Sequence, residues 1–369
     1  MADPKRKILL LNYRAGTSMS GIGEDDSAMT LGPHILKSHL LRNGRRDIEI
    51  SVTTLDQREC QETTLRNIHA LKPHIVGFSC FVWNYFSSLS LARKLKLILP
   101  DTKVIFGGAE VSDKDFSVEM MNRNPWIDAV FRGEAETSLE MYLDGNVRRD
   151  KIEGLIYKEN DRIAANDCLP RFAHPEETPS VYTPAFVRQF PVVYYATSRG
   201  CVGRCRYCQE WSKKRNLPLD RVEKDLGVIF KHGKMKMFHF IDSVLDDDPE
   251  RLNHILEITA RLNKQAVPIG GYFYFRNADP ELFEKLRRAH FKSLRIGVET
   301  HNKEALRRTG RGEGNLSCID SALPYKGDFN IVPYIITHLP EETPESFRTN
   351  IKECFHKGLF KLDFHCNRL

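Results

Sequence analysis

Short apolar runs of strand character alternate with helical patterns over the first 146 residues, and this alternation restricts the fold more than any other feature. The strand patterns cover residues 8–12, 48–52, 75–81, 103–106 and 129–132, with helical patterns at 32–42, 62–71 and 87–99. Strands that alternate with helices form a parallel sheet with helices on both faces. We therefore expect an α/β, flavodoxin-like doubly wound domain over residues 1–146, with its ligand beyond the carboxyl ends of the strands.

The alternation stops between residues 147 and 190 and then resumes. Short extended pieces and several prolines in this interval predict a linker with a hairpin. Six further strand patterns follow within 191–369, at 192–196, 237–241, 269–275, 293–298, 329–336 and 359–365. With helical patterns between them, they predict a partial (β/α)6 barrel whose chemistry lies at the strand carboxyl ends. Because the sequence stops after the sixth strand, we expect the barrel to lack its closing helix and a carboxyl-terminal segment.

The composition excludes several classes of protein. Hydrophobic residues make up 41% of the 369 residues and charged residues 28%, as in globular domains and unlike disordered or fibrous chains. No apolar run approaches the ~18 residues of a membrane span, and the amino terminus has no signal-peptide pattern. We therefore expect a cytoplasmic protein with no membrane partner. The net charge of +6 is spread over 55 basic and 49 acidic residues, so nucleic acid is not an expected partner.

Three of the nine cysteines crowd into one short segment. Cys201, Cys205 and Cys208 follow a strand pattern with C-x-x-x-C-x-x-C spacing. The odd total and the missing export signal argue against a disulfide framework. Such a loop can turn three thiolates toward one four-iron, four-sulfur cluster and leave the fourth iron for a chelating substrate, here the methionine amine and carboxylate of S-adenosylmethionine (SAM). The alternative is a zinc site, but no fourth cysteine or histidine lies nearby at a usual interval.

This cysteine segment resembles that of the radical SAM superfamily, and the resemblance extends to other strand ends. It implies that Tyr207, just before the third cysteine, packs near the adenine of SAM. Asp242 and Ser243 stand where the family has Gly-Gly-Glu, which implies that they meet the SAM amino group. Arg276, after the third strand, and Glu299, on the fourth, are similar to the family's SAM-contacting residues.

Three other features near these strands are a further segment similar to the family, a possible ion pair, and a run of aspartates to which we assign no chemical role. Residues 338–343, His-Leu-Pro-Glu-Glu-Thr, resemble the family's Gly-Leu-Pro-Gly-Glu-Thr with both glycines replaced. Arg276 and Glu299 could instead form an ordinary ion pair at the barrel rim. Asp246, Asp247 and Asp248 precede a proline and a helical pattern, so we interpret them as helix-capping residues.

A doubly wound domain before this barrel is similar to the layout of the cobalamin-binding radical SAM enzymes, which include the class B methyltransferases. Cobalamin domains place Ser-x-Leu at one strand end and Gly-Gly at the next. Ser79, in Ser-Cys-Phe, and Gly107 with Gly108 stand at consecutive strand ends here, and glycines allow close backbone approach. Gly133 and Glu134 are similar to the Gly-Glu-x-Glu that closes the family's domain. The resemblance thus implies that these residues contact cobalamin.

The motif that supplies a cobalt-ligating histidine in cobalamin mutases and methyltransferases, Asp-x-His-x-x-Gly, is absent. Residues 15–26 contain no histidine, and His34 has different neighbours. Either cobalamin binds without histidine on its lower face, or the domain is a relic. Gly16, Gly21 and Gly23 could form a phosphate-binding loop, although their spacing is not G-x-G-x-x-G.

The resemblance implies three cofactors, namely a [4Fe-4S] cluster, SAM and cobalamin, and a reaction. A deoxyadenosyl radical from SAM would abstract hydrogen from an unactivated carbon of a small-molecule metabolite, and methylcobalamin would donate the methyl group. An electron donor such as flavodoxin or ferredoxin is the implied protein partner. One alternative is a radical SAM cyclase or rearrangement enzyme that uses cobalamin without methyl transfer. Another is a non-catalytic module that binds cobalamin or a cluster.

Overall fold

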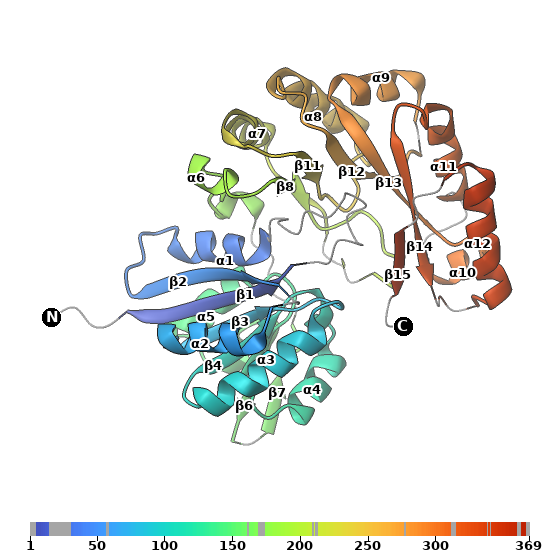
Figure 1. Cartoon of the computed structure of the whole chain (residues 1–369). Helices are drawn as coiled ribbons and strands as arrows, with labels where there is room; N and C mark the ends of the chain where they lie inside the picture. The colour runs from blue at the N-terminus through green and yellow to red at the C-terminus, as the bar shows by residue number, and fades with distance from the viewer. Residues whose placement is uncertain are drawn as a thin grey trace. The chain divides into compact units, whose positions relative to one another are not determined.

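The structure of the protein is a computed structural model that divides the chain into two compact units after residue 181, and each unit is described by itself (Figure 1). The structure describes residues 5–14, 31–56, 59–160, 162–168, 174–208, 210, 213–276, 278–310, 315–337, 339, 341–359 and 363–366.

In the described part of the first unit, a seven-stranded sheet has the order β2-β1-β3-β4-β5-β6-β7. The first five strands pair in parallel, and the hairpin β6-β7 adds to β5 in antiparallel fashion. The strands are Arg6–Tyr13 (β1), Ile48–Leu55 (β2), Ile75–Ser79 (β3), Lys103–Gly107 (β4), Ala129–Phe131 (β5), Leu155–Glu159 (β6) and Arg162–Ala165 (β7). The order 2-1-3-4-5 is flavodoxin-like, which confirms the predicted doubly wound fold.

Helices cover both faces of this sheet (Figure 1). They are Leu31–Leu41 (α1), Gln61–Leu71 (α2), Tyr85–Ile98 (α3), Lys114–Arg123 (α4) and Glu136–Asp144 (α5). Because neighbouring side chains of a strand point to opposite faces, β1 contributes to the hydrophobic core on each side of the sheet: Leu9 packs in one core and Leu10 in the other. The continuous apolar runs of these strands follow from burial on both faces. The sequence patterns did not predict α4 and α5; α4 begins at the N-cap Asp113, whose carboxylate accepts the N–H of Phe116.

The described part of the second unit contains a six-stranded sheet in the order β15-β14-β13-β12-β11-β8, in which every neighbouring pair is parallel. The strands are Val192–Tyr195 (β8), Met237–Phe240 (β11), Ile269–Phe273 (β12), Phe291–Glu299 (β13), Asn330–Thr337 (β14) and Asp363–Cys366 (β15). This confirms the predicted partial barrel. The carboxyl ends of these strands meet at one edge, where (β/α) barrels place their chemistry.

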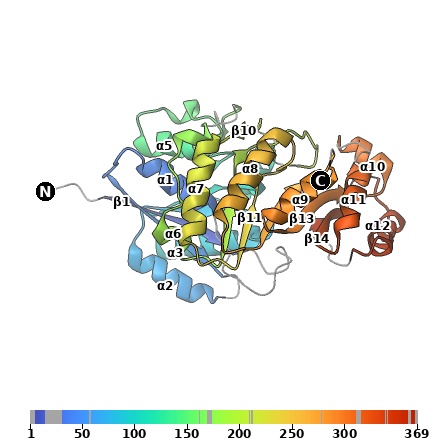
Figure 2. The same ribbon diagram turned by 90° about the horizontal axis from the view of Figure 1, so that it is seen from above.

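Several helices of the second unit begin at residues whose side chains cap the first turn. They are Pro184–Val187 (α6), Leu219–His232 (α7), Pro249–Leu262 (α8), Pro280–Arg288 (α9), Lys303–Arg308 (α10), Asn315–Ala322 (α11) and Pro344–His356 (α12), and Figure 2 shows them from above. Asp248, Asp279 and Thr343 each accept a backbone N–H in the first turn and precede a proline, which favours a helix start there. Among the described residues, no helix is both long and apolar enough to cross a membrane.

Candidate active site

The three clustered cysteines lie in one loop at the carboxyl end of β8. This cysteine loop, residues 200–214, connects the short strands Ser198–Arg199 (β9) and Arg215–Asn216 (β10), which pair antiparallel. A bridge between Cys201 and Lys213 closes it further. The pairing at its base joins the two ends of the loop, so the three thiols are presented by one short closed segment.

Backbone N–H groups point at the sulfur atoms of this loop. Gly203 donates to Cys201 Sγ at 3.3 Å, and Glu210 donates to Cys208 Sγ at 3.4 Å. A Cβ atom at Gly203 would lie 3.5 Å from Cys201 Sγ and 3.7 Å from Cys205 Sγ, so these two sulfurs flank the glycine. Burial raises the pKa of the Cys208 thiol, the Glu210 N–H lowers it, and the Cys205 and Cys201 thiols raise it. The interactions with Cys205 and Cys201 place all three thiols in one neighbourhood.

This donor set fits an iron–sulfur cluster better than a zinc ion. Within the described ranges, no three His, Cys, Asp or Glu side chains converge on a position for a single metal ion. Structural zinc requires four ligands around one ion. A four-iron cluster binds each thiolate at a different iron, so its ligands do not converge on one point, and N–H groups that donate to sulfur tune its potential.

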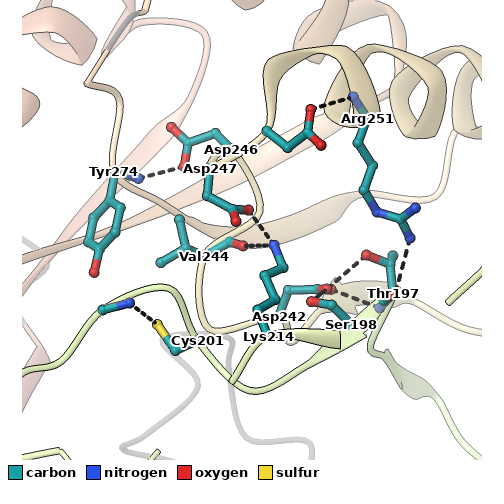
Figure 3. Close-up of polar contacts among 12 residues, drawn as sticks. Thr197, Ser198, Cys201, Lys214, Asp242, Val244, Asp246, Asp247, Arg251 and Tyr274 are labelled. Carbon is teal, nitrogen blue, oxygen red and sulfur yellow. Dashed lines mark hydrogen bonds and ion pairs between the residues drawn. The ribbon is translucent and has the colours of Figure 1, made fainter. Parts of the chain in front are cut away.

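A buried carboxylate holds the segment that enters the cysteine loop (Figure 3). Asp242 Oδ2 accepts the Thr197 N–H at 3.0 Å, while Oδ1 accepts the Thr197 hydroxyl at 2.8 Å and the Ser198 hydroxyl at 2.5 Å. Burial raises the pKa of Asp242, and these hydrogen bonds and Lys214 lower it. Asp242 therefore ties the end of β11 to the strand before the cysteines, whereas its neighbour Ser243 is exposed. The SAM contacts of both residues stay predictions.

Arg251 and Lys214 complete the support of the loop and were not identified from the sequence. Arg251, on α8, donates through Nη2 to the carbonyl oxygens of Thr197 at 3.1 Å and Leu217 at 2.7 Å. Lys214, within the loop, pairs with Asp247 and donates to the Val244 carbonyl at 3.4 Å. These contacts join residues 30 to 54 positions apart, so no local pattern signals them.

The interpretation of Asp246, Asp247 and Asp248 as capping residues is correct only for Asp248, which accepts the N–H of Arg251. Asp246 instead accepts the backbone N–H of Tyr274 at 2.7 Å (Figure 3) and that of Phe275 at 2.6 Å. It thereby fixes the segment after β12. These partners of Asp246 are 28 and 29 residues further along the chain, which explains why the local sequence predicted helix capping instead.

Aromatic and charged residues from other strand ends approach the cysteine loop. Tyr207 packs against the apolar cluster of Ala305, Ile336 and Leu339. The Tyr274 hydroxyl oxygen would lie 3.2 Å from a Cβ at Gly203, and the Arg276 guanidinium lies 4.8 Å from the centre of the Tyr274 ring. Tyr207 therefore contacts β14 through Ile336, and Arg276 stacks on Tyr274, whose hydroxyl lies near the cysteine loop.

Two strand ends have left-handed backbone at non-glycine residues. Glu299 is buried at the end of β13 with φ of 66°, and such strain concentrates at functional sites. Glu341 has φ of 69° and occupies the position of the second glycine in the family's Gly-Leu-Pro-Gly-Glu-Thr. The glycine-type backbone is therefore retained without the glycine. His338 and Pro340 of the same segment lie outside the described residues.

The expected cobalamin residues gather at the carboxyl edge of the first sheet, where Ser79 pairs with Gly107 across β3 and β4. Gly108 has φ of 103°, and a Cβ there would lie 2.5 Å from the Cys80 carbonyl oxygen. The close approach that this glycine allows is therefore to the chain's own backbone. Val82 and Phe86, which follow Ser79 in the sequence, have exposed apolar side chains.

The remaining residues that the sequence suggested for the first unit lie in a turn, in α1, or outside the described part of the chain. Gly133 has left-handed φ of 70° and turns the chain from β5 toward α5, and Glu134, in that turn, is half-buried. Burial and the nearby Lys37 lower the pKa of His34 to about 4, so this histidine is neutral. Gly16, Gly21 and Gly23 lie outside the described residues. The cobalamin contacts of Gly133 and Glu134 stay predictions.

Two family models match the chain in succession. The B12 binding domain matches residues 30–160, and the Radical SAM superfamily matches residues 195–354. The 2-(S-pantetheinyl)-carbapenam-3-carboxylate methyltransferase of Streptantibioticus cattleyicolor is 25% identical over 319 residues, which cover 78% of this chain and 45% of that protein. An anaerobic magnesium-protoporphyrin IX monomethyl ester cyclase of Rubrivivax gelatinosus is 24% identical over 227 residues, which cover 56% of this chain and 40% of that protein. This chain thus spans less than half the length of either relative.

A solved structure shares the fold. The radical SAM methyltransferase TsrM from Kitasatospora setae, with cobalamin and a [4Fe-4S] cluster bound, matches with a TM-score of 0.73 at 16% identity, over 99% of this chain and 76% of that chain. The B12 binding domain model thus falls on the unit with the seven-stranded sheet, and the Radical SAM model falls on the unit with the six-stranded parallel sheet. The chain therefore carries a B12 binding domain followed by a domain of the Radical SAM superfamily.

Proposed function

We propose that this chain methylates an unactivated carbon of a small-molecule metabolite, with a [4Fe-4S] cluster, SAM and cobalamin as cofactors. The observation that carries the proposal is the cysteine loop at the carboxyl end of β8, in a chain whose first unit matches the B12 binding domain. The relative that is named a methyltransferase supports methyl transfer. The relative that is named a cyclase favours, as a second candidate, a cobalamin-using reaction without methyl transfer.

When bound, the cofactors would supply the difficult chemistry, namely radical formation from SAM at the cluster and methyl transfer through cobalamin. The chain contributes ligands and orientation. Cys201, Cys205 and Cys208 would hold three irons and leave one open to SAM. Asp242 and Arg251 hold the strand that leads into the loop, which keeps the three thiolates in a fixed arrangement.

The exposed part of the cysteine loop is where we place the electron donor. Val202, next to Cys201, is exposed, so a flavodoxin or ferredoxin could approach the loop closely enough to pass an electron. We also place the protein in the cytoplasm, because a cluster ligated by cysteine suits a reducing compartment.

A single incubation tests the proposal and its alternatives. The reduced protein, loaded with cluster and cobalamin, is mixed with candidate metabolites and with SAM that carries a labelled methyl group. We expect labelled product together with one S-adenosylhomocysteine and one deoxyadenosine per methylation, since SAM serves as methyl source and as radical source. Substrate-dependent deoxyadenosine without label transfer would refute methyl transfer and support the second candidate. If neither S-adenosylhomocysteine nor deoxyadenosine appears above background, the result would point to a non-catalytic binding module.

A further inference from the structure

The sheet of the second unit has two faces of different chemistry. Helices α7, α8 and α9 cover one face (Figure 1), and aromatic rings pack beneath them: Phe238 lies 5.1 Å from Phe230 of α7, and Phe240 lies 5.9 Å from Phe291. Because neighbouring side chains of a strand point to opposite faces, His239 points to the other, concave face. Tyr194 lies there too, with its ring 5.8 Å from the imidazole of His239.

A β-bulge brings an arginine to the same face. Ile269 pairs with Phe291, but the next residue, Gly270, pairs with Ser293, so Lys292 has no partner across the strands. Such a bulge reverses the alternation of β13. Phe291 therefore packs under the helices, whereas Arg295 lies on the concave face. There its guanidinium is 5.4 Å from the ring centre of Tyr272.

His239 and Arg295 form one buried polar pair. The imidazole is 0% exposed and Arg295 is 5% exposed, and Arg295 Nη1 lies 3.4 Å from His239 Nδ1. Since a guanidinium can only donate, Nδ1 must accept, and the proton of the neutral ring resides on Nε2. Burial and Arg295 lower the pKa of His239 well below its ordinary value, which keeps the ring neutral.

The second nitrogen of this ring is a buried donor without an acceptor. Nε2 of His239 has no hydrogen-bond partner in the part of the chain that the structure describes. The ring cannot easily turn to find one, because it lies against Gly270, where a Cβ would be 2.3 Å from Nδ1. A buried N–H without an acceptor destabilises the folded protein, because the group loses its hydrogen bond to water and gains none in return. A protein that keeps such a donor on the concave face of its barrel sheet is prepared for an acceptor from outside the chain.

We propose that Arg295 and His239 form a carboxylate-binding subsite on the concave face of the second unit's sheet, so that the substrate carries a carboxylate group. The planar guanidinium matches a carboxylate in shape and charge, and the Nε2–H of His239 is a further donor to the same group. Tyr194 and Tyr272 are half-buried and flank the pair on this face. This inference rests on the proposed function, since it names the class of its substrate.

Butyrate and butyramide are suitable probes because they have the same shape and differ in charge. Binding of each is measured by calorimetry on the protein loaded with cluster and cobalamin, in the absence of SAM. We expect butyrate to bind and butyramide to bind at least about tenfold more weakly, since the ionic hydrogen bonds are lost. Equal binding of the two probes, or no binding of butyrate by the wild-type protein, would overturn the proposal. This comparison needs no variant and no turnover.

Variants then assign the subsite to its residues. Arg295→Gln should weaken butyrate binding about tenfold or more, and Arg295→Lys, which keeps the charge without the planar fork, should weaken it less. Arg288→Gln, which changes an exposed side chain of α9, is the matched control and should bind butyrate as the wild type does. Iron content and circular dichroism check that each variant folds.

Two further outcomes distinguish the carboxylate subsite from a SAM-binding site and from the methyl-transfer proposal. If Arg295→Gln weakens SAM binding as much as butyrate binding, the subsite receives the carboxylate of SAM and the proposal is wrong. Because probe binding is measured without turnover, it can succeed when label transfer fails. In that case the methyl-transfer proposal falls and the carboxylate subsite stands.

Discussion

Substitution of Gly108 by alanine tests how the edge of the first sheet is built. Gly108 has φ of 103° and ψ of 175°, a region open essentially to glycine alone. A Cβ at this position would lie 2.5 Å from the oxygen and 2.8 Å from the nitrogen of Cys80. Both atoms are backbone, so neither can move without displacing the end of β3. Two backbone hydrogen bonds depend on this contact, from Cys80 N to Gly107 O at 2.7 Å and from Glu110 N to Cys80 O at 3.2 Å.

The expected loss of stability follows from these contacts. The backbone conformation costs a non-glycine residue about 1–3 kcal/mol, and each weakened hydrogen bond costs about 0.5–1.5 kcal/mol. Gly108→Ala should therefore lower the free energy of unfolding by about 4 kcal/mol, a large part of the ~5–15 kcal/mol available to a domain.

Two other glycines provide matched controls for this substitution. Gly145 also has positive φ, of 67°, but a Cβ there meets nothing within 4 Å, and Gly32 lies in α1 with open space around it. Gly145→Ala should cost only the ~1–2 kcal/mol of a left-handed residue, and Gly32→Ala, in the first turn of α1 and before Pro33, should change the free energy of unfolding by less than about 1 kcal/mol. Urea unfolding is followed by tryptophan fluorescence, since two of the three tryptophans, Trp83 and Trp126, are in the first unit. If Gly108→Ala costs no more than Gly145→Ala, the close backbone approach is not what requires glycine.

Three other predictions follow from the two units. Alanine at Cys201, Cys205 or Cys208 should abolish the cluster after anaerobic reconstitution, whereas alanine at the exposed Cys60 should leave four irons per chain; four irons in a variant of the first set would contradict the ligand assignment. Asp242→Ala should lower the iron content and cost at least ~1–3 kcal/mol, because the buried Thr197 N–H loses its acceptor; unchanged iron and unfolding free energy would show that the loop does not depend on it. The cobalt(II) form of bound cobalamin should show no nitrogen superhyperfine splitting in its electron paramagnetic resonance spectrum, since the cobalt-ligating motif is absent; such splitting would place a histidine on cobalt.

Local sequence patterns determined the two sheets and the cysteine loop of this protein. Buried parallel strands need continuous apolar runs, and helices such as α8, α9 and α12 start at a capping residue followed by proline, so both kinds of element are visible within a window of a few residues. The three cysteines lie within eight residues, which makes their common role independent of how the rest of the chain folds. The same reasoning missed α4, α5 and α11, which are short helices whose stability comes from packing.

Only the tertiary structure decided what the polar residues around these elements do. Asp242 and Asp246 follow the same strand, but one binds Thr197 and the other binds the backbone after β12, and nothing in their immediate neighbours distinguishes them. His239 meets Arg295, 56 residues away, because a single unpaired residue in β13 reverses the faces of that strand. A buried polar side chain must find its partner among the groups that folding brings close. Such partners are set by strand order and register, which act over distances that no local pattern can show.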